Sequence, residues 1–238
     1  MNQVDQLLMD RPAFHASGSA CHGLSNEALR FLHEHVNAES RTLETGNGMS
    51  TVLFAMARCH HTCISPIQSE VERIKQYCAA HGISPDGIRF CVDFSENVLP
   101  GLALEPLDFV LIDGGHGFPV PFLDWFYAGR MMKPGGLLLV DDTQLWTGRV
   151  LRQFLLDEPG WEWVGELGLR TAVFRKREGC KDRAEWCNQP FAVKKQRWLN
   201  VAYDLKTIGA RLRKGQFSDL LCDFKSRLNK YIHGRARI

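Results

Sequence analysis

The stretch Leu43-Glu44-Thr45-Gly46-Asn47-Gly48-Met49-Ser50-Thr51 decides the fold of this chain. A short strand ends in an acid, a Gly-x-Gly bend follows, and residues 51–57 have the pattern of a helix. Glycine is needed where the backbone turns sharply or approaches a ligand closely. The first turn of a helix offers N–H groups that have no partner within the helix. The stretch therefore predicts a strand–loop–helix unit that holds a ligand at the carboxyl end of the strand.

The residues around the bend limit the kind of ligand. A dinucleotide fingerprint requires a third glycine, and Thr51 stands at that place. The lysine of a phosphate-binding P-loop is also absent. Glu44 would repel a pyrophosphate, whereas it suits a cationic group such as the ammonium of S-adenosylmethionine. A plain turn between a strand and a helix is the alternative interpretation.

Strands and helices alternate along the rest of the chain. Ser25 is expected to cap a helix that runs to about residue 37. Strands are predicted at 62–64, 88–92, 107–112 and 137–140, helices around 71–78, 121–132 and 147–157, and a turn at 134–136. Such apolar strands indicate a parallel sheet buried on both faces. Residues 161–167 and 170–175 predict an antiparallel hairpin at its edge.

Composition and charge describe an ordinary globular chain with a basic tail. The chain has 238 residues, of which 45% are hydrophobic and 24% charged, which excludes a disordered or collagen-like protein. Residues 178–238 carry a net charge of +8, against −6 for residues 1–177. No apolar run reaches the roughly 20 residues of a membrane span, and no secretory signal is visible. We therefore expect a cytoplasmic protein.

Three regions are predicted from these patterns. They are an N-terminal helical cap (1–40), a central domain (41–177) and a basic amphipathic helical tail (178–238). Apolar residues of the tail recur on one helical face over 198–212 and again over 217–232. The first interpretation of these faces is packing against the central domain or a second subunit, as in a homodimer. The second is a peripheral contact with an anionic membrane surface.

Several motifs in order resemble class I S-adenosylmethionine-dependent methyltransferases, and within them the small-molecule O-methyltransferases of the metal-dependent catechol and macrolide-sugar types. The motifs are Leu43–Thr51, Leu111-Ile112-Asp113-Gly114-Gly115-His116, Asp124, Met132-Lys133-Pro134-Gly135-Gly136 and Asp141-Asp142. The likeness covers residues 25–177. It implies an α/β, Rossmann-like fold with a seven-stranded sheet in the order 3-2-1-4-5-7-6, the last strand antiparallel, and helices on both faces. The predicted edge hairpin agrees with this order.

The resemblance also implies where the cofactor binds. Glu44 and the glycine bend would hold the methionine end, and Asp93, after the third strand, would lie near the adenine. Ile67 stands where relatives carry the acid that binds the ribose, so Ser65, Gln68 or Glu70 would have to substitute for it. The residues expected to bind S-adenosylmethionine are Glu44, Gly46, Asn47, Gly48, Ser50, Asp93 and Asp113.

Three carboxylates end the fourth and fifth strands. Asp113 follows one strand, and Asp141 and Asp142 follow the next. Converging carboxylates repel one another unless a cation or a proton intervenes, and oxygen ligands with open positions suit Mg²⁺. The resemblance implies the same metal, held by these three residues. Alternatively, Asp141 and Asp142 form a solvated strand end or a helix cap, and Asp113 only orients the cofactor or the loop.

The expected chemistry is methyl transfer to oxygen. Asp113 and His116 are the predicted catalytic residues, with His116 accepting the proton of a hydroxyl group. The acceptor is expected to be a small hydroxylated molecule, such as a sugar or a natural product; nucleic acid is disfavoured, because no Asn/Asp-Pro-Pro-Tyr type motif is present. The aromatic residues Phe118, Phe122, Trp125, Phe126 and Trp146 would form either a substrate pocket or core. The alternative functions are an NAD-type oxidoreductase and a non-catalytic binding protein with a decayed cofactor site.

Overall fold

The computed structural model describes residues 3–15, 23–103, 105–180 and 184–213. The chain forms two compact units, Met1–Arg183 and Ala184–Ile238. The first unit holds every strand of the described residues, and the second holds one long helix. The predicted boundary after residue 177 precedes the start of the second unit by a short segment, and the predicted N-terminal cap belongs to the same compact unit as the sheet.

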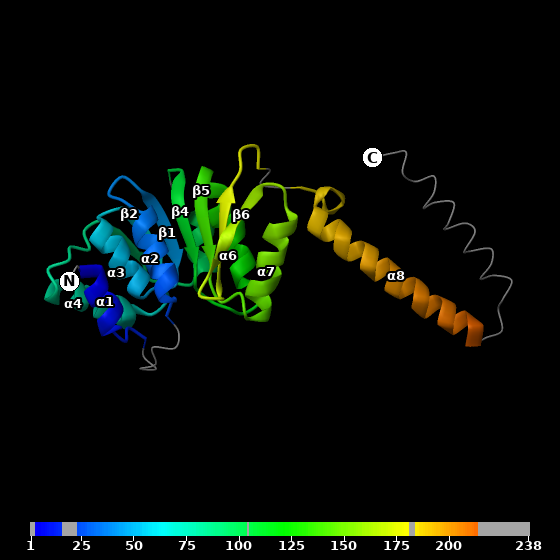
Figure 1. Cartoon of the computed structure of the whole chain (residues 1–238), viewed down its shortest axis with the longest axis horizontal. Coiled ribbons are helices and arrows are strands. Elements are labelled where there is room, and N and C mark those ends of the chain that lie inside the picture. Colours follow the sequence, from blue (N-terminus) through cyan, green and yellow to red (C-terminus); the bar gives the residue numbers. More distant parts are fainter. Residues whose placement is uncertain (1–2, 16–22, 104, 181–183, 214–238) are drawn as a thin grey trace. The chain divides into compact units, whose positions relative to one another are not determined.

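A seven-stranded mixed sheet forms the centre of the first unit (Figure 1). The order β3-β2-β1-β4-β5-β7-β6 confirms the predicted topology. Strands β1 to β5 pair in parallel, and β7 runs antiparallel to both β5 and β6. The strands are β1 (Arg41–Thr45), β2 (His60–Ile64), β3 (Ile88–Cys91), β4 (Leu107–Ile112), β5 (Met132–Val140), β6 (Trp161–Leu167) and β7 (Thr171–Lys176).

Helices cover both faces of this sheet. Alternate strand residues such as Phe109 and Leu139 pack into one core with apolar residues of α1, α2, α3 and α4. Val110 and Leu138 point to the opposite face, where α6 contacts β4, β5 and α7. The helices are α1 (Gln3–Asp10), α2 (Asn26–His35), α3 (Met49–Ala57), α4 (Gln68–Ala80), α5 (Ser95–Val98), α6 (Val120–Met131) and α7 (Trp146–Asp157).

The structure differs from the sequence prediction at two places in this unit. Helix α1 is absent from the prediction, and it buries Val4, Leu7 and Leu8 in the core. The expected turn at 134–136 lies within the bounds of β5, as an irregularity between the paired residues Met132 and Leu137, where Gly135 has a φ of +83°. The cap of α2 is as predicted: the Ser25 hydroxyl accepts a hydrogen bond from the Ala28 N–H at 3.1 Å.

In its described residues, 184–213, the second unit contains the short 3₁₀ turn Trp186–Asn188 and α8 (Pro190–Arg213). Trp198, Val201 and Leu205, which the sequence places on one apolar face, are exposed. The second apolar segment of the predicted tail, 217–232, lies outside the described residues. Within the described ranges, no helix has both the length and the apolar character needed to cross a membrane.

Candidate cofactor and acceptor site

The glycine bend lies at the carboxyl end of β1, against the end of β4. Gly46 has a φ of +90°, and its N–H donates to the Ile64 carbonyl at 2.9 Å. A Cβ at this position would lie 2.2 Å from the carbonyl oxygen of Asp113. Only glycine meets both conditions, so the bend brings the start of α3 directly beside the residues that follow β4.

A pocket of about 390 Å³ opens beyond the carboxyl ends of β1, β2 and β4. This is the place where parallel sheets bind ligands, and the volume is that of a small-molecule site. Asn47 lines the pocket and is 8% exposed. Both polar atoms of its side-chain amide are buried and make no hydrogen bond with any described residue. Because buried amides are normally paired, the pocket fits a polar ligand that Asn47 would bind.

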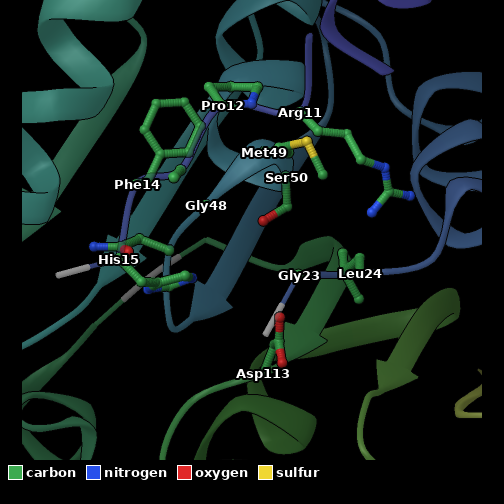
Figure 2. A pocket seen from close by; sticks show the side chains of 12 residues that line it. Arg11, Pro12, Phe14, His15, Gly23, Leu24, Gly48, Met49, Ser50 and Asp113 are labelled. Carbon is green, nitrogen blue, oxygen red and sulfur yellow. The ribbon is translucent and has the colours of Figure 1, made fainter. Parts of the chain in front are cut away.

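A smaller cavity of about 30 Å³ lies on the other side of the bend (Figure 2). Residues 11–15 of the N-terminal segment form one wall, over the start of α3. Ser50 and Asp113 point into this space from opposite sides (Figure 2). Asp113 lines both cavities, so the two spaces meet at the end of β4.

Glu44 lies beneath the bend, in a buried hydrogen-bond network. Its Oε2 accepts from the Ser50 hydroxyl at 2.6 Å, and its Oε1 accepts from the Thr51 hydroxyl and lies 3.1 Å from His61 Nε2. The Glu44 side chain is 1% exposed and lines neither cavity. In these contacts Glu44 fixes the start of α3 onto the sheet, and its predicted direct contact with a cofactor stays a prediction.

The same network accounts for a buried Glu44–His61–Cys63 group whose donor atoms lie within 4.8 Å of one another. His61 stacks on Phe54, and its Nδ1 lies 2.7 Å from the Thr42 hydroxyl. Burial, with Glu44 adding to it, raises the pKa of the Cys63 thiol well above its ordinary value. Because Glu44 and His61 already have hydrogen-bond partners within the protein, we interpret this group as a structural support of the bend.

Asp93 and its neighbours occupy the end of β3. The Asp93 carboxylate accepts from the Phe94 N–H at 2.7 Å and from the Asn97 amide at 3.0 Å, which lowers the Asp93 pKa. Phe94 and Ser95 line the large pocket, whereas Asp93 does not. The predicted role of Asp93 near an adenine stays a prediction; the exposed Phe94 ring is the pocket residue that the sequence reasoning missed.

The loop after β2 supplies a carboxylate to the pocket. Ile67, at the position expected for an acid, lines the pocket and is 43% exposed. Gln68 points away to bond with Glu72. Glu70 lines the pocket, is 4% exposed, and its Oε1 lies 3.1 Å from His15 Nδ1. Of the predicted substitutes, Ser65 and Glu70 therefore face the pocket.

The carboxylates after β4 and β5 converge, as predicted. Burial raises the pKa of Asp113 well above its ordinary value, and the nearby charges of Asp141 and Asp142 raise it further. One oxygen of Asp142, one of Asp113 and a ring nitrogen of His116 lie within 4.8 Å of one another. The Nε2–H of His116 donates to Asp142 Oδ2 at 3.0 Å, and this hydrogen bond is the first cause of a raised His116 pKa.

Arg170 lies against these carboxylates, and the sequence reasoning did not anticipate it. Its Nη2 donates to Asp141 Oδ2 at 2.8 Å and also to Asp142 Oδ1. The second oxygen of Asp141 accepts from the Thr171 hydroxyl. The guanidinium closes the shared edge of Asp141 and Asp142 to Mg²⁺, so the contacts do not fit the predicted metal where it would bind both of these carboxylates. Asp113, His116 and Asp142 still offer one ligand atom each within 4.8 Å of one another.

Two exposed aromatic side chains lie close together where α6 and α7 begin. Phe118 and Trp146 are each 66% exposed, and their ring centroids lie 5.9 Å apart. Trp125 instead packs against Phe154 of α7, at 4.7 Å between centroids. Trp125 therefore follows the core interpretation, whereas Phe118 and Trp146 are exposed and line neither cavity, so their place in a substrate pocket stays a prediction.

Comparison with known proteins agrees with this geometry. Residues 43–143 match the sequence profile of a family described as "Methyltransferase domain". The matched segment is similar to a methyltransferase domain, and the sheet has the strand order that the resemblance to class I S-adenosylmethionine-dependent methyltransferases implies. The matched segment begins at β1 and ends just after Asp142, so it contains the bend and all three carboxylates. Comparison with curated proteins gives no match.

Solved structures share the fold of the methyltransferase domain. Cofactor-bound Rv0187 from MTB is 20% identical, with a TM-score of 0.60, covering 75% of this chain and 92% of that one. The O-methyltransferase TomG from Streptomyces achromogenes, in complex with SAM, is 18% identical, with a TM-score of 0.60, covering 75% and 91%. An O-methyltransferase from Bacillus cereus in complex with SAH is 15% identical, with a TM-score of 0.57, covering 74% and 90%.

Proposed function

We propose that this methyltransferase transfers the methyl group of S-adenosylmethionine to a hydroxyl oxygen of a small molecule. The observation that carries the proposal is the buried, unpartnered amide of Asn47 in a 390 Å³ pocket at the carboxyl ends of the strands. A nucleotide-linked amino acid offers the donors and acceptors that such an amide lacks.

The pocket residues suit the parts of this cofactor in turn. The bend Gly46-Asn47-Gly48 and the first N–H groups of α3 would hold the methionine end, with Ser50 beside them. Glu70 would accept hydrogen bonds from the ribose hydroxyls in place of the acid missing at Ile67. The exposed ring of Phe94 would stack on the adenine.

His116 is the proposed general base. Its Nε2–H is committed to Asp142, which leaves Nδ1 to accept the proton of the acceptor hydroxyl as that oxygen becomes the nucleophile. When bound, S-adenosylmethionine supplies a methyl carbon to this oxygen, and the electron pair of the broken carbon–sulfur bond goes to sulfur. Asp142 stabilises the imidazolium that forms, and Asp113 lines the cavities next to the reacting groups.

The acceptor would enter past the exposed rings of Phe118 and Trp146. Apolar rings beside a polar base favour an acceptor that carries both an apolar surface and a hydroxyl group, such as a hydroxylated natural product or a sugar derivative. A homodimer, a peripheral membrane contact through the basic tail and a cytoplasmic location remain predictions from the sequence.

Methyl transfer tests the proposal directly. The full chain is incubated with S-adenosylmethionine labelled in its methyl group and with a panel of phenols, sugars and hydroxylated polyketides. We expect label in at least one hydroxyl acceptor, and a loss of about tenfold or more in kcat/KM for Asn47→Ala, since a buried hydrogen bond is worth about 1–3 kcal/mol. Asn200→Ala, on exposed α8, is the matched control. Label found only on nitrogen or carbon would contradict the proposal.

A further inference from the structure

Arg170 is built into the site by the turn between β6 and β7. The Arg170 carbonyl accepts from the backbone N–H of Thr143 at 2.9 Å and from the Thr143 hydroxyl at 2.8 Å. Thr143 follows Asp142 directly, so the segment that carries the two carboxylates also holds the arginine backbone. The backbone that carries the guanidinium is therefore fixed next to Asp141 and Asp142.

The backbone conformation and the burial of Asp141 and Asp142 hold their carboxylates in place beside Arg170. Asp142 has a left-handed backbone with a φ of +53°, a conformation that aspartate adopts more readily than most residues. Its two oxygens face different partners: Gln144 and Arg170 on Oδ1, and His116 on Oδ2. The Asp141 side chain is fully buried, and the Arg170 side chain is only 21% exposed.

Charge explains why these contacts matter. Two adjacent buried carboxylates are stable as anions only when a cation is paired with them. A guanidinium that donates hydrogen bonds to both carboxylates stabilises them strongly, because these hydrogen bonds are charge-assisted. A divalent ion on the same edge would repel the guanidinium while both compete for the same oxygens. One of the two can occupy the site at a time.

We propose that Arg170 is the resident cation of this site, taking the place that a divalent metal holds in the relatives that the sequence resembles. Methyl transfer by this chain then proceeds without a metal, a part of the inference that rests on the proposed function. Arg170 acts here as a positioning residue: it holds Asp142, and through Asp142 it orients the His116 ring.

Binding of Mn²⁺, followed by electron paramagnetic resonance, tests the proposal without any acceptor. The titration uses the full chain with S-adenosylhomocysteine added. We expect the wild type to leave the signal of free Mn²⁺ unchanged, and Arg170→Gln to lower that signal by binding Mn²⁺, as the edge between the two carboxylates opens. Arg175→Gln, an exposed arginine on β7, should behave as the wild type.

Three results would overturn the proposal. The first is that the wild type binds one Mn²⁺ per chain and Asp141→Asn loses it. The second is that Arg170→Gln folds and still excludes Mn²⁺. The third is that EDTA abolishes methyl transfer. Arg170→Lys covers the case in which Arg170→Gln does not fold, because it keeps the charge; it should exclude Mn²⁺, and binding would contradict the charge argument. Calorimetry of S-adenosylhomocysteine on the same protein reports separately on the proposed function.

Discussion

The backbone conformation and the packing at position 46 both require glycine, which has no side chain. The φ of this residue is positive, and the Asp113 carbonyl oxygen would lie only 2.2 Å from a Cβ. Gly46→Ala should therefore cost about 2 kcal/mol or more of folding free energy and weaken cofactor binding. Denaturant unfolding measures the first effect and calorimetry the second. Gly101→Ala, where a Cβ meets nothing within 4 Å, should change stability by less than about 0.5 kcal/mol. Equal stability of the two variants would contradict this account of the bend.

The raised pKa of Asp124 predicts how the stability of the protein depends on pH. Burial raises its pKa from 3.8 to about 6, although the hydroxyls of Ser95 and Thr45 oppose the shift. The unfolded chain loses this proton near pH 4, while the folded chain keeps it until about pH 6. The free energy of unfolding should therefore fall by about 3 kcal/mol between pH 4 and pH 6 from this group alone, and then level off.

Asp124→Asn should remove that dependence. Urea unfolding of both proteins between pH 4 and pH 7 is the measurement, and the variant is expected to be the more stable one at pH 7. A wild type whose stability rises steadily through the window, with the variant following the same curve, would show that Asp124 is ionised in the folded chain.

His116 predicts the pH dependence of the reaction. Its hydrogen bond to Asp142 raises its pKa, and a general base must be neutral to accept a proton. Methyl transfer should therefore be lost as pH falls through a pKa above the ordinary value of 6.5. His116→Gln should lower kcat by about a hundredfold or more and flatten the profile. An unchanged profile in that variant would assign the base elsewhere.

Single residues are predictable where strand order alone brings them together. Asp113 and Asp141 end neighbouring parallel strands, so their convergence follows from the topology. Arg170 approaches through the turn of an antiparallel hairpin, and the pairing of His15 with Glu70 joins residues 55 positions apart. No periodicity or spacing in the sequence indicates either contact, and both depend on how the chain folds back.

Helix α1 shows how much one short element contributes to the stability of the core. Leu7 is fully buried, whereas Met9 on the same helix is 70% exposed. Leu7→Ala should destabilise the chain by about 2–5 kcal/mol, because it removes core contacts and leaves a cavity, and Met9→Ala should have almost no effect. Thermal unfolding compares the two. If Leu7→Ala unfolds as the wild type does, α1 is not part of the core.

Elements with a long periodic pattern are predictable from the sequence, and short ones are not. Strands β4 and β6 have the predicted bounds because their strand patterns run between clear turn residues. Helix α1 has only eight residues, so its pattern is too short to separate from a loop. Pro134 and two glycines favour a turn at the start of β5, and the strand is irregular there, since residues 133–136 have no partner in β4.

The division into two units predicts what a truncated chain can do. Met1–Arg183 contains the sheet, both cavities and every residue proposed to act on the cofactor. A chain that ends at Arg183 should fold with nearly the same melting temperature and bind S-adenosylhomocysteine with the affinity of the full chain. Loss of binding in a folded truncation would assign a part of the site to the tail.

The central claim is that the pocket beside Gly46-Asn47-Gly48 binds S-adenosylmethionine. Isothermal titration of the full chain with S-adenosylhomocysteine, and separately with NADH, tests it most directly. We predict one S-adenosylhomocysteine bound per chain, about tenfold weaker binding in Asn47→Ala, and no heat with NADH. Heat with NADH and none with S-adenosylhomocysteine, on folded protein, would contradict the account.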